Sequence, residues 1–352
     1  MLEEVDWDIH DGLQRTRRLV ENMEPSLVVL VGDVMLDRYI YGYANNLNPR
    51  APVPVLKETH REQGAGAAAH VARGLHSLQM EVAIYGVVAA DEAGQDVIEA
   101  LEEVGISSDG VALLEDWRTT VKTRFIASRE SLIANKQMML RLDEESGTDV
   151  PDEVADLLCE QAIERLSSAK ALVISDYGKG VVNDETAKKL IDAASKTGIP
   201  VVCDPKLTGL HRTRGADVVL FESRGLELMR RRLSKSNPEE AAEELVSEYG
   251  WGALVVLGGQ NGLDLYSSEG ENIHVDCTLP SPSQQIGLID AAVVAAIASR
   301  ILSLTDVDMA HLINAACECI LEAEDADHFA IDRRELCTRL DEIAWAMQIS
   351  QR

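Results

Sequence analysis

Short apolar segments recur along the chain from about residue 26 onward, and segments with helical periodicity separate them. The apolar segments are 27–31, 82–85, 171–174, 200–203, 218–220 and 253–257, and the helical ones are 67–78, 94–104, 151–166, 183–197 and 290–304. Strands that are apolar along their whole length are buried on both faces, as in a parallel sheet covered by helices. Successive parallel strands also need a crossover between them, which is usually a helix. The sequence therefore predicts an α/β fold with a doubly wound, mainly parallel sheet.

Two segments depart from this alternation. Residues 39–58 contain three prolines among alternating apolar residues, and residues 119–142 alternate as strands do around a loop at 129–135. Antiparallel excursions of this kind often cover an active site, so we expect a small β-lid from these two segments. Residues 1–25 are expected to form a helical extension, which leaves residues 26–345 as the main domain.

The charge balance restricts the partners of this protein. Its 352 residues include 33 Lys and Arg against 60 Asp and Glu, a formal net charge of −27. Nucleic acids and acidic membrane surfaces attract basic proteins, so neither is expected as a partner. The acidic N-terminus is unlike a targeting peptide, and no segment approaches the roughly 20 apolar residues of a membrane helix. We expect a cytoplasmic protein.

Cysteine spacing gives no metal site. Cys317 and Cys319 follow His311, but a spacing of two residues on a helix directs the two thiols to different faces. We expect both to be buried core residues with reduced thiols.

Several predicted strands end in an aspartate, where open parallel sheets bind their ligands. These residues are Asp33, Asp176 and Asp204, and Lys179 and Lys206 follow two of them closely. A single aspartate at a strand end is usually a cap for the next turn. Three together with lysines favour a site for a polyol and a phosphate, because carboxylates accept hydroxyl hydrogen bonds and lysines attract phosphate.

The longest apolar helix begins near Gly287 and carries Asp290 in its first turn. Free backbone N–H groups at a helix N-terminus bind phosphate, and a neighbouring aspartate can serve as a base for a hydroxyl. An ordinary helix-start carboxylate explains the same pattern, and spacing alone does not decide between the two.

A dinucleotide-binding loop is disfavoured. Gly64, Ala65 and Gly66 loosely imitate the glycine fingerprint, but the charged residues 61–63 stand where a strand should precede it. The chain also lacks the G-x-x-x-x-G-K-[ST] phosphate loop of Walker-type NTPases and the nucleophile elbow of α/β-hydrolases.

Four motifs together resemble those of the ribokinase-like sugar kinases, and they are most similar to the D-glycero-β-D-manno-heptose-7-phosphate kinases. The motifs are Val31-Gly32-Asp33-Val34-Met35-Leu36-Asp37-Arg38-Tyr39, Asn48-Pro49-Arg50-Ala51-Pro52-Val53-Pro54-Val55, Ser175-Asp176-Tyr177-Gly178-Lys179-Gly180 and Asp204-Pro205-Lys206. The resemblance extends from about Leu27 to Leu340.

This resemblance implies an ATP- and Mg²⁺-dependent phosphotransferase whose β-lid can pair two subunits. It implies that Asp290 is the catalytic base, and that backbone amides starting at Gly287 stabilise the transferred phosphoryl group. The implied substrate-binding residues are Asp33, Asp37, Gly66, His70, Lys122, Arg141, Asp176 and Lys179. The implied nucleotide-binding residues are Asp204, Lys206, Gly259, Gly262 and Asn314, and no protein residue is assigned as a metal ligand.

The chain departs from the family pattern mainly on the nucleotide side. Ile289 replaces the second glycine of the G-A-G-D motif, and its side chain is expected to crowd the phosphate. Six further family positions are also altered: Gln284 and Ile286 in D-x-T-G, Glu222 and Gly225 in N-x-x-E, Leu257 at the nucleotide-loop threonine, and His70 at the sugar-binding asparagine.

These departures leave two hypotheses. The first is an active sugar or sugar-phosphate kinase, which the retained Asp290, Asp37 and Lys206 favour. The second is a non-catalytic descendant that keeps the fold for sugar binding or protein assembly, which the changes at Ile289, Glu222 and Leu257 favour.

Overall fold

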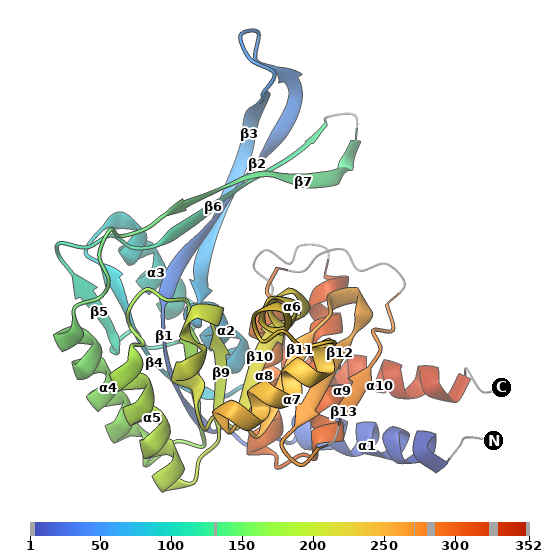
Figure 1. Ribbon diagram of the computed structural model, residues 1–352. Helices are drawn as coiled ribbons and strands as arrows, with labels where there is room; N and C mark the ends of the chain where they lie inside the picture. The colour runs from blue at the N-terminus through green and yellow to red at the C-terminus, as the bar shows by residue number, and fades with distance from the viewer. Residues whose placement is uncertain (1–3, 130–131, 271, 280–285, 324–329, 350–352) are drawn as a thin grey trace.

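In the computed structural model, which describes residues 4–129, 132–270, 272–279, 286–323 and 330–349, a large twisted sheet forms the centre of the molecule (Figure 1). Its strand order is β13-β12-β11-β10-β9-β8-β1-β4-β5, and the pairs from β11 to β5 are parallel. The strands are β1 (Leu27–Gly32), β4 (Glu81–Ala89), β5 (Val111–Leu114), β8 (Ala171–Asp176), β9 (Val201–Pro205), β10 (Val218–Glu222), β11 (Ala253–Leu257), β12 (Leu263–Ser267) and β13 (Asn272–Val275). The predicted doubly wound α/β fold is confirmed.

Helices cover both faces of this sheet, because successive strand residues point to opposite sides. In β1, Val28 and Leu30 join the core under α2, α8 and α9, whereas Val29 and Val31 join the core under α4 and α5. The helices are α1 (Glu4–Glu21), α2 (Ala68–Ser77), α3 (Glu92–Glu102), α4 (Asp152–Leu166), α5 (Asp184–Thr197), α6 (Ser223–Arg232), α7 (Pro238–Tyr249), α8 (Leu288–Ile301), α9 (Asp306–Glu322) and α10 (Arg333–Ile349), with short 3₁₀ helices at Leu207–Thr213 and Gly259–Asn261.

Local sequence signals set several helix ends. Asn183 caps α5 by accepting hydrogen bonds from the backbone of Glu185 and Thr186, and Gly198 ends that helix in the left-handed conformation with φ 70°. Glycine adopts this conformation without the steric cost that a Cβ imposes. The predicted helix at 183–197 therefore agrees with α5 to within one residue.

A second, four-stranded sheet stands away from the central sheet (Figure 1). Its order is β3-β2-β6-β7, from β2 (Val34–Leu47), β3 (Pro54–Ala67), β6 (Val121–Arg129) and β7 (Leu132–Glu144). Two antiparallel hairpins join through parallel pairing of β2 with β6. This sheet corresponds to the expected β-lid, but its strands are longer than predicted, and β7 includes part of the expected 129–135 loop, whose residues 130–131 lie outside the described residues.

The structure corrects one sequence interpretation. Residues 61–63, which were expected not to form a strand, lie within β3 and lead directly into α2. Residues 57–63 of β3 are exposed, so charged side chains are compatible with a strand there. The strand belongs to the lid and pairs antiparallel with β2, so it does not create the parallel strand-loop-helix unit of a dinucleotide site.

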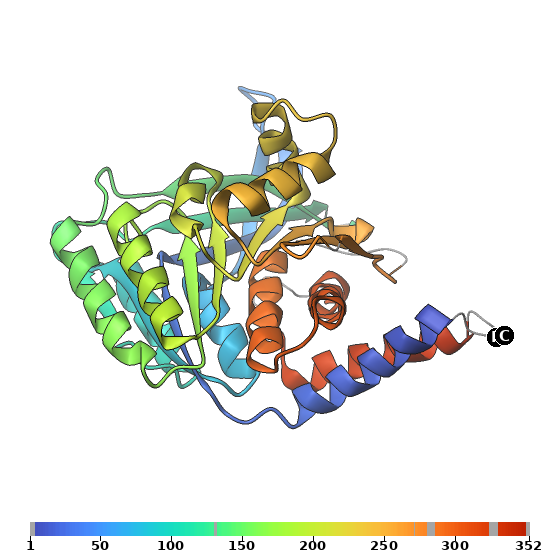
Figure 2. The ribbon, with the colours of Figure 1, turned by 60° about the horizontal axis from the view of Figure 1, so that its bottom comes forward.

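Helices α1 and α10 pack side by side and project away from the central sheet (Figure 2). Arg17 on α1 bonds to Asp341 on α10 at 3.1 Å, and Cys337 of α10 donates to the Arg17 carbonyl. The predicted N-terminal helical extension is thus held by the C-terminal helix. No helix in the described ranges has the length and apolar character needed to cross a membrane.

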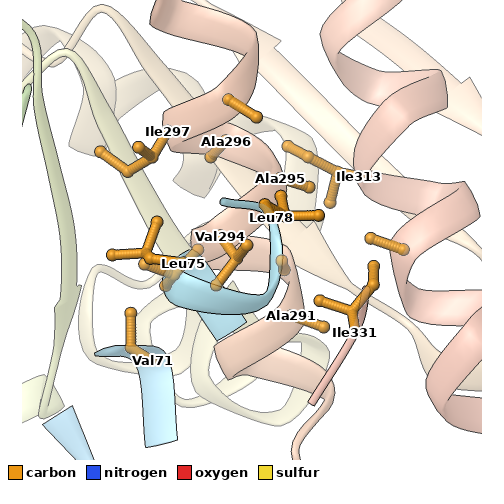
Figure 3. Close-up of a cluster of buried hydrophobic side chains, with 14 of the residues drawn as sticks. Val71, Leu75, Leu78, Ala291, Val294, Ala295, Ala296, Ile297, Ile313 and Ile331 are labelled. Atoms are coloured by element: carbon orange, nitrogen blue, oxygen red, sulfur yellow. The ribbon is translucent and has the colours of Figure 1, made fainter. Parts of the chain in front are cut away.

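The core between α2, α8 and α9 consists of small and branched aliphatic side chains (Figure 3). Gly74 of α2 lies so close to α8 that an added Cβ would be 2.8 Å from a methyl group of Val294. Cys317 and Cys319 on α9 are buried in the same core, as expected. This close packing fixes α2 against the start of α8.

Candidate functional site

The N-terminus of α8 provides the central feature of the site. Gly287 precedes the helix with φ 81° and ψ 2°, and no side chain caps the first turn. A Cβ at this position would lie 3.2 Å from Cε1 of His70, so both the conformation and the space favour glycine. Uncapped first-turn N–H groups can bind an anion, and the anion site predicted here from the sequence stays a prediction.

Asp290 lies in that first turn and bonds to a histidine from α2. Nδ1 of His70 is 2.9 Å from Oδ2 of Asp290, and the two side chains are only 13% and 14% exposed. The other carboxylate oxygen, Oδ1, is buried and has no hydrogen-bond partner among the described residues. A buried acceptor without a donor is costly, so this oxygen is suited to receive a ligand hydroxyl.

The aspartates at the strand ends have different surroundings. Asp204, at the end of β9, is 4% exposed, and its Oδ1 has no hydrogen-bond partner among the described residues. Burial, together with the negative charge of Asp290, raises the pKa of Asp204 well above its usual range. Asp204 and Asp290 thus each have a buried carboxylate oxygen without a hydrogen-bond partner among the described residues.

Asp33 shapes the loop after β8. Its Oδ2 accepts hydrogen bonds from the backbone of Tyr177 at 2.8 Å and Lys179 at 3.0 Å, and its Oδ1 accepts one from Val181 at 3.4 Å. Burial raises the pKa of Asp33 to about 6, although these backbone donors favour the charged form. Asp33 is only 2% exposed, so it holds the backbone of this loop and has little accessible surface for contact with a substrate.

Asp176 is similarly engaged by its own chain. Its Oδ1 accepts from the backbone of Gly178 at 2.8 Å, and its Oδ2 accepts from Arg212 at 3.0 Å. The guanidinium of Arg212 also donates to the Val182 carbonyl at 2.9 Å. Both sequence-predicted carboxylates, Asp33 and Asp176, therefore hold the 177–182 loop in place.

A cavity of about 340 Å³ lies beside these residues. It brings together six of the sequence-predicted site residues: Lys122, Arg141, Asp176, Lys179, Asp204 and Lys206. It also includes Glu222 and Ile289, which the sequence places at altered family positions, and four residues that were not predicted as site residues: Asp143, Glu145, Tyr177 and Pro205. The position of Tyr177 between Asp176 and Gly178 in its motif was the available signal for the tyrosine.

The cations of this cavity are balanced by acids and an aromatic ring. The ammonium of Lys122 lies 4.9 Å from the centre of the Tyr177 ring, and burial lowers the pKa of Lys122. Lys179 pairs with Glu145 at 2.6 Å, and Arg141 pairs with Asp143 at 2.8 Å. Such pairs can exchange an acidic neighbour for the phosphate of a ligand.

Asp37 and Gly66 meet at the base of the lid. A Cβ on Gly66 would lie 2.3 Å from Oδ2 of Asp37, so any side chain there would displace the carboxylate. Oδ1 of Asp37 accepts from Arg124 at 2.5 Å, and Arg124 stacks on Tyr39 with 5.1 Å to the ring centre. Arg124 was not predicted as a site residue, although it lies two residues after Lys122 on β6 and so shares its face.

The predicted nucleotide residues are more dispersed. Gly259 and Gly262 flank the turn between β11 and β12 with φ values of 61° and 77°, and a Cβ on Gly262 would lie 1.9 Å from the Val275 carbonyl oxygen. Asn314 lines a different cavity, of about 850 Å³, between β13, α9, α1 and α10. The structure therefore does not bring Asn314 into the cavity that contains Lys206.

Asn314 is held by neighbouring residues. Its Nδ2 donates to the Asp276 carbonyl at 3.1 Å and to Glu318 at 3.2 Å. Glu318 is fully buried and also accepts from the backbone and hydroxyl of Thr278 at 2.5 and 2.9 Å. The amide donors of Asn314 are thus directed at the chain itself. Gln284, the altered position upstream of Gly287, lies outside the described residues.

The model of the pfkB family carbohydrate kinases matches residues 25–319 of this chain. The chain belongs to the pfkB family of carbohydrate kinases. The fold and family resemblance expected from the sequence are both confirmed.

Curated relatives of this member of the pfkB family include the bifunctional protein HldE of Paramagnetospirillum magneticum. The two are 32% identical over 308 residues, which cover 86% of this chain and 61% of the relative. HldE of Haemophilus influenzae is 34% identical over 267 residues, which cover 74% of this chain and 51% of the relative. The chain thus spans about half to three-fifths of the length of these relatives.

Solved structures share the fold of this pfkB family member at low identity. Arabidopsis thaliana ribokinase, solved with ribose and ATP, superposes with a TM-score of 0.67 at 16% identity and covers 90% of this chain and 99% of its own. Escherichia coli phosphofructokinase-2, solved with fructose-6-phosphate, gives a TM-score of 0.70 at 17% identity and covers 91% of this chain and all of its own.

Proposed function

We propose that this protein transfers the γ-phosphoryl group of ATP to a hydroxyl of a sugar phosphate. The observation that carries the proposal is the unpartnered Oδ1 of Asp290, which lies in the same helical turn as the free N–H groups that follow Gly287. One helix terminus thereby supplies an acceptor for the hydroxyl proton and donors for the transferred phosphoryl group. The relatedness to HldE proteins supports a heptose phosphate as the acceptor.

In the proposed reaction, Asp290 accepts the proton of the acceptor hydroxyl while the hydroxyl oxygen attacks the γ-phosphorus. The bond from the γ-phosphorus to the bridging oxygen breaks, and its electron pair leaves with ADP. The N–H groups of the first turn of α8 stabilise the charge on the phosphoryl oxygens. Lys206, which is exposed on the cavity wall, adds a positive charge on the nucleotide side.

The substrate half of the proposal uses the residues below the lid. Asp37 accepts sugar hydroxyls, because the absence of a side chain on Gly66 lets its carboxylate lie there. Lys122 and Arg141 attract the phosphate already on the acceptor. Lys179 also binds that phosphate when its ammonium leaves the ion pair with Glu145. Asp33 and Asp176 act indirectly, by holding the loop that carries Lys179.

On the nucleotide side, the start of α8 offers a phosphate site, and the metal site is less complete. No side chain of the described residues caps the first turn of α8, so its N–H groups can bind a phosphate there. No group of three or more His, Cys, Asp or Glu side chains among the described residues could hold a metal ion alone. Mg²⁺ would bind through the nucleotide phosphates, with Asp204 and Glu222 on the cavity wall as its protein neighbours.

A non-catalytic sugar-phosphate-binding protein is the second candidate. Ile289 lines the cavity beside Asp204 and Lys206, where the first candidate places the transferred phosphoryl group. The internal hydrogen bonds of Asn314 also favour this candidate, because they leave its amide donors less available to a nucleotide.

Calorimetry with ATP and Mg²⁺, followed by a phosphate-transfer assay on a panel of heptose and hexose phosphates, separates the two candidates. The kinase proposal predicts ATP binding and turnover, and it predicts that Asp290→Asn lowers kcat by about 10²–10⁴-fold. Asp109→Asn, which removes an exposed carboxylate outside the cavity, is the matched control and leaves kcat unchanged. Absence of ATP binding at millimolar concentration refutes the kinase and favours the second candidate.

We also propose that two chains pair through their lids and that the protein works in the cytoplasm. Apolar side chains are exposed on the lid segments: Leu47, Val53, Val55, Met138, Leu140 and Leu142. Exposed apolar side chains on one sheet favour association. Light scattering on the purified protein tests the dimer, and Leu140→Lys is expected to yield monomers.

A further inference from the structure

His70 is held against the start of α8 by the hydrophobic core. It lies on α2, whose neighbouring residues Val71 and Leu75 pack into the cluster that includes Val294 of α8 (Figure 3). The His70 ring can lie at the start of α8 because Gly287 has no side chain. A Cβ on Gly287 would be 3.2 Å from Cε1 of the ring. The distance between His70 and Asp290 is therefore set by packing between two rigid helices.

The hydrogen bond from His70 gives the two oxygens of Asp290 different surroundings. A carboxylate only accepts, so the proton in the 2.9 Å contact must lie on Nδ1 of His70. This contact occupies Oδ2 and leaves Oδ1 buried without a partner among the described residues. In the described part of the chain, no hydrogen bond joins the other ring nitrogen, Nε2, to another residue. His70 can therefore gain and lose a proton at Nε2 while Nδ1 keeps Asp290 in place.

Charged groups from three elements surround the His70 ring. Asp290 of α8 and Asp37 of β2 favour the imidazolium form, whereas Arg73 of α2 disfavours it. Burial lowers the pKa of His70, but the hydrogen bond and charge of Asp290 outweigh burial, so the net pKa is raised above its ordinary value. The ring thus keeps its proton to a higher pH than an ordinary histidine does.

We propose that His70 is a positioning residue for Asp290. The hydrogen bond from His70 holds Oδ2 in place so that Oδ1 receives the acceptor proton, and the charge of the His70 ring controls how readily Oδ1 takes that proton. This inference rests on the proposed phosphoryl transfer. When His70 is an imidazolium, its positive charge opposes the transfer of a proton to the neighbouring Oδ1. When His70 loses the Nε2 proton, the hydrogen bond to Oδ2 stays and that opposition is removed.

An NMR titration tests the pairing without any turnover. The ring signals of the histidines are followed against pH in the intact protein, and His70→Asn identifies the His70 signal by its absence. In Asp290→Asn, the midpoint of the His70 titration is expected to fall by about one pH unit, a tenfold change in the dissociation constant. Asp290→Ala repeats the measurement with a second variant, and an unshifted midpoint in both overturns the inference.

Kinetics against pH then separate positioning from simple substrate contact. Asparagine can place its amide near the position of Nδ1 but does not titrate in this range, so His70→Asn is expected to lose the rise of kcat with pH. His70→Leu loses the donor as well and is expected to have a kcat about tenfold lower than His70→Asn, with KM for the sugar phosphate changed less than about twofold. His76→Asn, on the same helix, is the matched control and keeps the wild-type pH profile.

The outcomes distinguish this inference from the proposed function. Absence of turnover with every acceptor refutes the phosphotransferase. Turnover with an unshifted His70 titration, or with an unchanged pH profile in His70→Asn, overturns only the role of His70. A raised KM with unchanged kcat in His70→Leu also overturns it, because that result indicates a substrate contact.

Discussion

Gly66→Ala is expected to displace Asp37 and weaken the base of the lid. The added Cβ would lie 2.3 Å from Oδ2 and 2.8 Å from Cγ of Asp37, whereas ordinary contacts begin at 3.4 Å. The carboxylate must therefore move by roughly 1 Å, in a region as closely packed as other protein interiors. Gly66 does not have a positive φ, so the backbone itself accepts alanine without strain.

The size of the effect follows from these contacts. Overpacking of this kind costs about 1–3 kcal/mol. Displacement of Asp37 also stretches its 2.5 Å hydrogen bond to Arg124, in which both side chains are less than 20% exposed. Loss of such a bond costs about 1 kcal/mol more, so the unfolding free energy should fall by about 2–4 kcal/mol. Binding of sugar phosphates through Asp37 should weaken with it.

A double-mutant cycle isolates the contact. Asp37→Ala removes the group that the new Cβ would meet, so Gly66→Ala is expected to cost less than about 1 kcal/mol in that background. Chemical denaturation measures stability, and calorimetry with a sugar phosphate measures binding. Gly147→Ala is the control, because nothing lies within 4 Å of a Cβ at that exposed position. Equal costs of Gly66→Ala with and without Asp37 would refute the reasoning.

Three further predictions concern the same site. Ile289→Gly removes the side chain that lines the phosphate end of the cavity, so the kinase proposal predicts tighter binding of ATP with Mg²⁺ by calorimetry; weaker or unchanged binding contradicts it. Ala67 has φ 52° and ψ −127° just before α2, a strained conformation for alanine, so Ala67→Gly should raise the unfolding free energy by about 1 kcal/mol, and a loss of stability contradicts this. Burial and the charge of Asp290 raise the pKa of Asp204 in the folded state, so folding favours its protonated form and stability is lost as pH rises from about 4 through the folded pKa. Asp204→Asn should therefore stabilise the protein more at pH 8 than at pH 5 in thermal melts, and an equal effect at both pH values contradicts the raised pKa.

Residues that act locally could be placed from the sequence. The apolar strands, the capped helix α5 and the glycine-started helix α8 each have signals within a few neighbouring residues. Charged lid residues such as 61–63 were misread, because an exposed strand lacks the apolar pattern that identifies a buried one. The short edge strands β5 and β13 were also missed, since four residues show little periodicity.

Long-range contacts decided the chemistry of the site. The sequence by itself determined the α/β fold, the family and the candidates at strand and helix ends, because periodicity and motifs are local properties. Tertiary structure decided that Asp33 binds backbone amides, that Asn314 faces Glu318, and that His70 contacts Asp290 across 220 residues of sequence. A side chain's partners, and hence its charge and its role, depend on which helices the core brings together.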